Sequence, residues 1–153
     1  MVPVPSFHHI GIQTDDLGNS SSWYRDFFGC SQSWSLDTFS ELTRSRLPGI
    51  VSLVEMVVGD IRIHLFERPG RAAIHPRDSV IQFQHVCVAA NSADELRDWR
   101  QRWLRLFGSG KYTFAFAEEA TEIVTDDDGI QSFYAYDVNG LEFEFTYAAG
   151  DAP

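Results

Sequence analysis

The chain has 153 residues, of which 44% are hydrophobic and 22% are charged, and its formal net charge is −10. This composition predicts one globular domain with a full hydrophobic core. The negative charge disfavours binding to nucleic acid or to an anionic membrane surface, because both repel an acidic protein. No apolar run approaches the ~20 residues that cross a bilayer, and the first residues lack the features of a secretion signal. We therefore expect a cytoplasmic protein.

The first half of the sequence predicts a strand, a helix and then further strands. In chain order the clearest of these are a strand over 7–12, a helix near Leu17–Phe28, and a hairpin of Ile50–Val58 with Ile61–Phe66. Gly29 stands where a helix-ending glycine is expected. Gly59 and Asp60 form the expected two-residue turn of the hairpin. The stretch 68–80, rich in Pro, Gly and Arg, is expected to be a linker.

The second half repeats this order. Its clearest elements are a strand over 83–88, a helix near Ala93–Phe107 that stops at Gly108, and a hairpin of Gln131–Tyr136 with Leu141–Tyr147. Asn91 or Ser92 is the expected N-cap, with Glu95 placed as in a capping box. The dipeptide Asn139–Gly140 is a strong turn signal. Cys30 and Cys87 are too few for a disulfide framework and are expected as buried thiols.

The repetition predicts an α+β fold made of two βαβββ modules. Module 1 covers about 6–67, the linker 68–80, and module 2 about 81–148. One such module cannot cover its own sheet, but two can pack their sheets into one curved layer. We therefore expect a single domain over 1–153.

The repeat also aligns four residues of the types that bind metals. His9 and His85 occupy the same position in the first strand of each half, and His64 and Glu144 occupy the same position in the last strand. Three imidazoles and one carboxylate suit one divalent transition metal, which could be Fe, Ni, Co, Mn or Zn. On a five- or six-coordinate ion, four protein ligands leave one or two coordination positions for water or substrate, as in a catalytic site.

Three further residues, His8, Glu55 and His75, are of types that could belong to the site, and their positions in the chain indicate different roles. If the first strand includes His8, its side chain points away from His9, so His8 is not expected as a ligand. If Gly59 and Asp60 form a two-residue turn, Glu55 lies opposite His64 on the same sheet face. Glu55 is therefore a candidate catalytic base, or a residue that orients the His64 ring. His75, beside Pro76, is expected on the surface.

Three sequence runs carry a family resemblance. The runs HIGI at 9–12 and WYRDFFG at 23–29 resemble the opening of vicinal oxygen chelate proteins, and DVNGLEFE at 137–144 resembles their closing pattern. In that pattern Val138 replaces the usual Pro and Leu141 the usual Asn, while the spacing from Asp137 to Glu144 is kept. The run IHLFERP at 63–69 is similar to a third family motif, with His64 where Glu or Gln is common.

The resemblance implies a U-shaped, barrel-like mixed sheet with helices outside, a small-molecule substrate and a homodimer. It implies a metal-dependent isomerase, epimerase or lyase of the glyoxalase type, in which Glu144 is a ligand that can also move protons and Glu55 is a further candidate. Two alternatives stay open because the superfamily spans several reaction classes. One is an Fe(II)-dependent, extradiol-type dioxygenase, and the other is a resistance protein that binds a small molecule without catalysis. Family members differ in whether the ligands come from one chain or are shared across the dimer.

Overall fold

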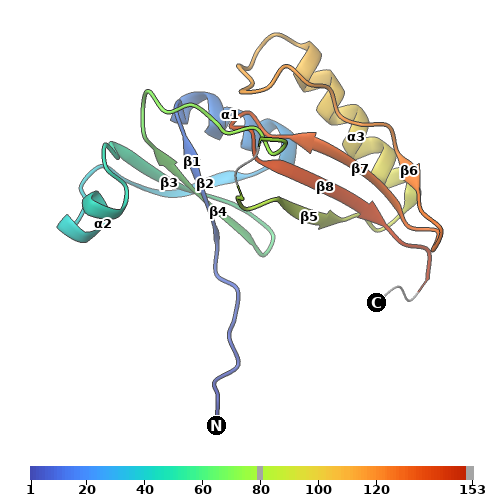
Figure 1. Cartoon of the computed structure of the whole chain (residues 1–153), viewed down its shortest axis with the longest axis horizontal. Coiled ribbons are helices and arrows are strands. Elements are labelled where there is room, and N and C mark those ends of the chain that lie inside the picture. Colours follow the sequence, from blue (N-terminus) through green and yellow to red (C-terminus); the bar gives the residue numbers. More distant parts are fainter. Residues whose placement is uncertain (79–80, 151–153) are drawn as a thin grey trace. The chain divides into compact units, whose positions relative to one another are not determined.

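The computed structural model describes residues 1–78 and 81–150. The chain divides into two compact units, Met1–Arg71 and Ala72–Pro153, and each is described here by itself (Figure 1). The boundary falls inside the expected linker 68–80. Residues 79 and 80 of that linker, and the last three residues of the expected domain 1–153, lie outside the described residues.

The first unit is a βαβββ module with one additional short helix. Its elements are β1 (Ile10–Thr14), α1 (Leu17–Phe28), β2 (Ser31–Leu36), α2 (Glu41–Arg46), β3 (Ser52–Val58) and β4 (Ile61–Glu67). The strands form a mixed sheet in the order β1-β4-β3-β2. In this sheet β1 is parallel to β4 and the other pairs are antiparallel.

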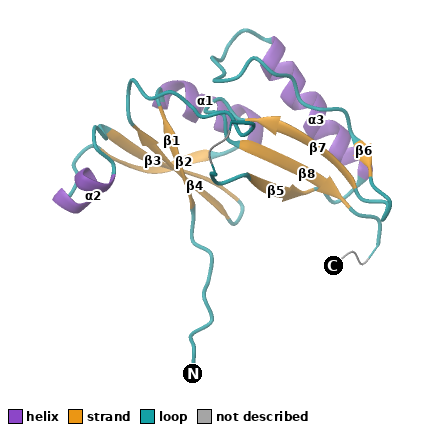
Figure 2. Ribbon diagram, in the orientation of Figure 1, coloured by secondary structure: helices purple, strands orange, loops and turns teal. Residues whose placement is uncertain are grey.

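The second unit repeats this topology. Its elements are β5 (His85–Ala89), α3 (Ala93–Gly108), β6 (Val124–Thr125), β7 (Gln131–Tyr136) and β8 (Glu142–Tyr147). The strand order is β5-β8-β7-β6, again with one parallel pair, β5 with β8. The α+β class with two βαβββ modules is therefore confirmed, and Figure 2 distinguishes the helices from the strands by colour.

Each sheet buries one face under its helix. In the first unit α1 packs on β3 and β4, and residues that are at most 2% exposed fill the contact: Trp23, Tyr24, Phe27, Ile63 and Leu65. In the second unit α3 packs on β7 and β8, with the corresponding residues Leu96, Trp103, Phe133, Phe143 and Phe145. Because strand side chains alternate between faces, the residues between these positions lie on the opposite face of each sheet.

Capping residues begin and end α1 and α3 close to where the sequence predicts. The Asp16 carboxylate accepts from the Asn19 N–H at 2.9 Å and caps α1, and Gly29 follows it with φ of 76°. The Ser92 hydroxyl accepts from the Glu95 N–H at 3.0 Å and caps α3. This helix extends one residue beyond the predicted Phe107, to Gly108.

Both first strands begin later than the sequence predicts. β1 begins at Ile10 rather than 7, and β5 begins at His85 rather than 83. A strand extends only where a neighbour offers hydrogen bonds. The β5 ladder begins with His85 opposite Glu142, where β8 itself begins. As a result, His9 lies just outside β1, while His85 is the first residue of β5.

In the part of the chain that the structure describes, no helix has both the length and the apolar character needed to cross a membrane.

Candidate metal centre

The predicted site residues lie in two clusters, one in each unit, together with His8, Cys87 and Tyr134, which were not predicted as site residues. The first-unit cluster consists of His8, His9, His64 and Glu55. The second-unit cluster consists of His85, Glu144, Cys87 and Tyr134. Each lies on or beside the sheet face opposite the helix.

In the first-unit cluster, a buried carboxylate holds His64. The β3–β4 register places Glu55 directly opposite His64, as the two-residue turn predicts. Nε2 of His64 lies 2.9 Å from a carboxylate oxygen of Glu55, and His64 is 8% exposed. Since this contact engages Nε2, the nitrogen available to a metal is Nδ1. A carboxylate behind a histidine is the usual support for a metal-binding imidazole.

The Glu55 carboxylate is itself held firmly. It is 1% exposed, and its other oxygen accepts from Nη1 of Arg62 at 3.0 Å. The hydrogen bond from His64 lowers the pKa of Glu55, helped by a hydrogen bond from Ser33 and by the charge of Arg62, while burial opposes them. A carboxylate stabilised in this way is a weak proton acceptor. The contacts suit orientation of His64 better than proton abstraction from a substrate.

His9 lies face to face with His64. Their ring centroids are 3.7 Å apart and their planes differ by 10°. Partial burial lowers the pKa of His9, and the charges of His64 and His8 lower it further against a smaller opposing effect of Glu55. The neutral imidazole that this favours is the form that binds metals.

The structure corrects the expectation for His8. Alternation within a strand would have pointed its side chain away from His9, yet both residues precede β1 and the rule does not apply to them. Nδ1 of His8 lies 2.9 Å from Nδ1 of His9. One ligand atom from each of His8, His9 and His64 lies within 4.8 Å of the others.

In the second-unit cluster, His85 and Glu144 are in contact. Nε2 of His85 lies 3.1 Å from a carboxylate oxygen of Glu144. The ladder places Glu144 between Cys87 on β5 and Tyr134 on β7. Partial desolvation by neighbouring atoms, then the charge of Glu144 and a hydrogen bond to it, raises the pKa of Cys87 to about 11. The same causes raise the pKa of Tyr134. Cys87, which the sequence analysis expected to be buried, is exposed.

A pocket of about 500 Å³ opens beside this cluster within the second unit. This volume lies within the range of small-molecule sites. Polar and aromatic residues predominate in its lining: Pro76, Arg77, Gln84, His85, Glu118, Glu119, Thr121, Tyr134, Ala135, Tyr136 and Glu142. The three glutamates outnumber the one arginine, so the pocket favours a bound cation or a ligand with hydrogen-bond donors.

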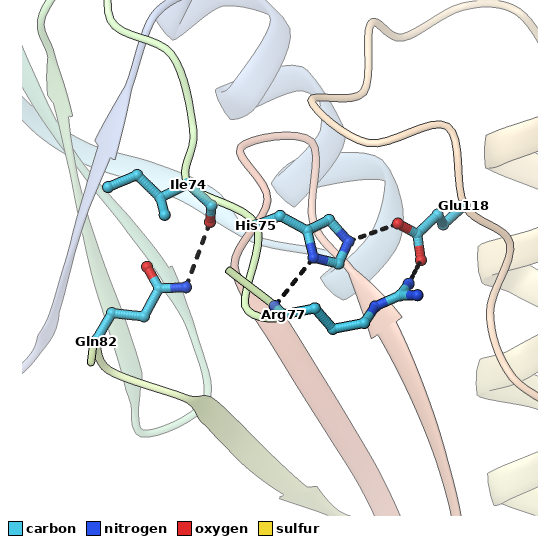
Figure 3. Close-up of polar contacts among 5 residues, drawn as sticks. All are labelled: Ile74, His75, Arg77, Gln82 and Glu118. Atoms are coloured by element: carbon cyan, nitrogen blue, oxygen red, sulfur yellow. Dashed lines mark hydrogen bonds and ion pairs between the residues drawn. The ribbon is translucent and has the colours of Figure 1, made fainter. Parts of the chain in front are cut away.

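A small ionic cluster forms one side of the pocket (Figure 3). His75 lies 2.5 Å from one oxygen of Glu118, and Arg77 pairs with the other oxygen. The His75 ring also contacts Phe116 and Tyr136. His75 is therefore half-buried rather than on the surface as expected.

Sequence reasoning missed several pocket residues. Glu118 and Thr121 lie between α3 and β6, in a segment that forms neither helix nor strand. Tyr136 could have been found, because it lies two positions from Tyr134 on the same face of β7.

The structure thus brings His9, His64 and Glu55 together in the first unit, and His85 and Glu144 together in the second. The donors fit a divalent transition metal in two respects. They are imidazoles and one carboxylate, and a buried carboxylate orients His64.

The sequence matches one family model, described as the Glyoxalase/Bleomycin resistance protein/Dioxygenase superfamily, over residues 6–145. No curated protein matches the sequence.

Solved structures of the same fold are distant in sequence. Lactoylglutathione lyase from Agrobacterium tumefaciens is 22% identical, with a TM-score of 0.60 and 96% of each chain covered. A glyoxylase/bleomycin resistance protein/dioxygenase domain from Frankia sp. EAN1pec is 12% identical, with a TM-score of 0.71, covering 98% of this chain and 96% of that one. A mutant of the fosfomycin resistance protein FosX from Listeria monocytogenes, complexed with Mn(II) and 1S,2S-dihydroxypropylphosphonic acid, is 15% identical, with a TM-score of 0.67. There the match covers 97% of this chain and 96% of that one. At these identities the similarity shows the fold alone.

Proposed function

The chain belongs to the Glyoxalase/Bleomycin resistance protein/Dioxygenase superfamily, and we propose that it is a metal-dependent isomerase, epimerase or lyase of the glyoxalase type. Its substrate would be a small oxygenated molecule. The observation that carries the proposal is the contact of His85 with Glu144 at 3.1 Å, beside a pocket large enough for such a molecule.

The proposed ligands are His9, His64, His85 and Glu144, with one divalent ion that is Fe, Ni, Co, Mn or Zn. When bound, such an ion polarises the oxygen atoms of a substrate and stabilises negative charge on them. His64 is suited to the role because Glu55 fixes its ring. The carboxylate of Glu144 supplies the one anionic ligand.

Glu144 is the proposed proton carrier. Its carboxylate would take a proton from a carbon next to a carbonyl group and return it to the neighbouring position. Cys87 and Tyr134 hydrogen-bond to this carboxylate, which holds it beside His85 and Tyr134 of the pocket lining. Glu55, the second candidate, would act through His64 by keeping its ring oriented.

The metal site can be tested on untagged protein. His9→Ala, His64→Ala, His85→Ala and Glu144→Ala are each expected to lose the metal that survives dialysis in the wild type, and activity with it. Metal content per chain, measured by plasma mass spectrometry, is the readout. A variant that keeps full occupancy after dialysis would remove that residue from the ligand set. His75→Ala serves as a control, since this histidine pairs with Glu118 outside the ligand set.

The reaction class can be tested without knowing the substrate. A panel of α-hydroxy carbonyl compounds and thiol adducts of 2-oxoaldehydes is incubated with the enzyme in D₂O. Proton-transfer chemistry is expected to introduce deuterium at carbon, as seen by NMR, and Glu144→Gln to abolish it. Oxygen uptake with a substrate instead would establish the dioxygenase alternative. Tight ligand binding without any metal would establish the resistance-protein alternative.

The homodimer, the cytoplasmic location and the single domain over 1–153 remain predictions from the sequence and the family resemblance.

A further inference from the structure

We propose that His8, His9 and His64 form a three-imidazole site that binds a divalent transition metal within the first unit, without donors from the second. This goes beyond the proposed function, in which His8 has no role and His85 and Glu144 are required for tight binding. The two proposals share His9 and His64, so that both concern the same ion.

The spacing of His8 and His9 is that of two ligands on one ion. Their Nδ1 atoms are 2.9 Å apart. Two nitrogens, each about 2.1 Å from one ion, lie about 3.0 Å apart when the two bonds meet at a right angle. A metal between the two nitrogens would therefore replace their direct contact, with the rings turned so that both lone pairs point at it.

His64 lies within reach of the same point. The ligand atoms of all three residues lie within 4.8 Å of one another, and two nitrogens on opposite sides of one ion are about 4.2 Å apart. The remaining difference in distance is small and falls on two exposed side chains. His8 and His9 are both exposed and precede β1, so no strand ladder fixes their backbone.

The three rings differ in how firmly they are held. Glu55 fixes His64, which leaves its Nδ1 for the ion. His9 is stacked on His64 at 3.7 Å, so its ring must turn out of the stack for both lone pairs to meet at one ion. His8 lies in edge contact with both, at ring-centroid distances of 5.1 Å to His9 and 6.2 Å to His64. One anchored imidazole and two adjustable ones suit Ni(II), Co(II) or Zn(II), which bind imidazole well, rather than Mg²⁺ or Ca²⁺.

The test uses the full-length, untagged chain stripped with a chelator and titrated with Ni(II) by calorimetry. The background is His85→Ala with Glu144→Ala, which removes the ligands of the second unit. To this background either His8→Ala or, as the matched control, His75→Ala is added. His8 is exposed and outside any strand, so its loss should leave the fold intact, which circular dichroism verifies.

We expect the double variant to bind one Ni(II) per chain more weakly than the wild type. Adding His8→Ala should weaken binding further, on the order of tenfold or more, and adding His75→Ala should not. With Co(II), the absorption bands of the double variant should change only when His8 is removed. Absence of Ni(II) binding by the double variant, or an unchanged affinity after loss of His8, would overturn the three-imidazole site.

The same titration separates this inference from the proposed function. If the wild type binds Ni(II) tightly and the double variant binds none, the four-residue site stands and the three-imidazole site falls. If the wild type and the double variant bind equally well, with dependence on His8, then His85 and Glu144 are not ligands and only the first-unit site stands.

Discussion

Both carboxylate oxygens of Glu55 are engaged, one by His64 and the other by Arg62. Glu55→Gln would replace one of these acceptor oxygens by an amide group that donates. We expect metal to remain bound and turnover to fall about 10- to 100-fold, because the His64 ring loses its fixed orientation. Steady-state kinetics with metal content per chain is the measurement. Arg62→Gln is the matched control. It keeps the contact between Glu55 and His64, so turnover should fall less than in Glu55→Gln. Unchanged turnover in Glu55→Gln would remove Glu55 from the mechanism.

Glu55 also predicts how stability depends on pH. Its folded-state pKa is lowered from the ordinary value of 4.5, so the folded protein favours the charged carboxylate. This contribution is fully present above about pH 4.5 and is lost as the pH falls through the lower folded pKa. The difference in Tm between the metal-free wild type and Glu55→Gln should therefore shrink between pH 5 and pH 3. A difference that stays constant over this range would contradict the assignment.

At the scale of elements, two hairpin turns use glycine for different reasons. Gly59 and Gly140 both have positive φ, of 53° and 86°. Nothing lies within 4 Å of the position that a Cβ would take at Gly59. At Gly140 a Cβ would lie 2.6 Å from the Phe116 ring and 3.1 Å from the Ala73 side chain. The second turn therefore also requires the absence of a side chain.

The two turns make a matched pair for mutation. Gly59→Ala should cost about 1–2 kcal/mol for the left-handed conformation alone. Gly140→Ala should cost this amount plus about 1–3 kcal/mol for overpacking against Phe116. Urea unfolding followed by tryptophan fluorescence measures both. Equal losses would show that Phe116 moves aside without cost.

At the scale of the whole molecule, the open question is whether the proposed ligands belong to one chain or to two. His64→Ala and Glu144→Ala each disable one set of donors. If a site combines the first unit of one chain with the second unit of another, a mixed dimer of these variants contains one intact site. Mixing them after reversible unfolding should then restore activity, up to about a quarter of the wild-type value for random pairing. If all ligands come from one chain, mixing restores nothing.

The positions of His64 and Glu55 follow from the sequence because short-range rules determine them. A two-residue turn sets the hairpin register, and the period of two along a strand sets the face. The caps at Asp16, Gly29 and Ser92 are equally local. The internal repeat places His85 and Glu144 at equivalent positions of the second module, where the structure shows them on the neighbouring strands β5 and β8.

The α+β class, the two modules and the equivalent positions of the ligand-type residues thus follow from local sequence patterns. The place of His8 depends on tertiary packing. β1 begins at Ile10, so the alternation of side chains along a strand does not apply to His8. Tertiary packing alone brought Arg77 and Glu118 to the pocket. These residues meet through loop packing, which depends on the whole fold and leaves no periodic pattern in the sequence.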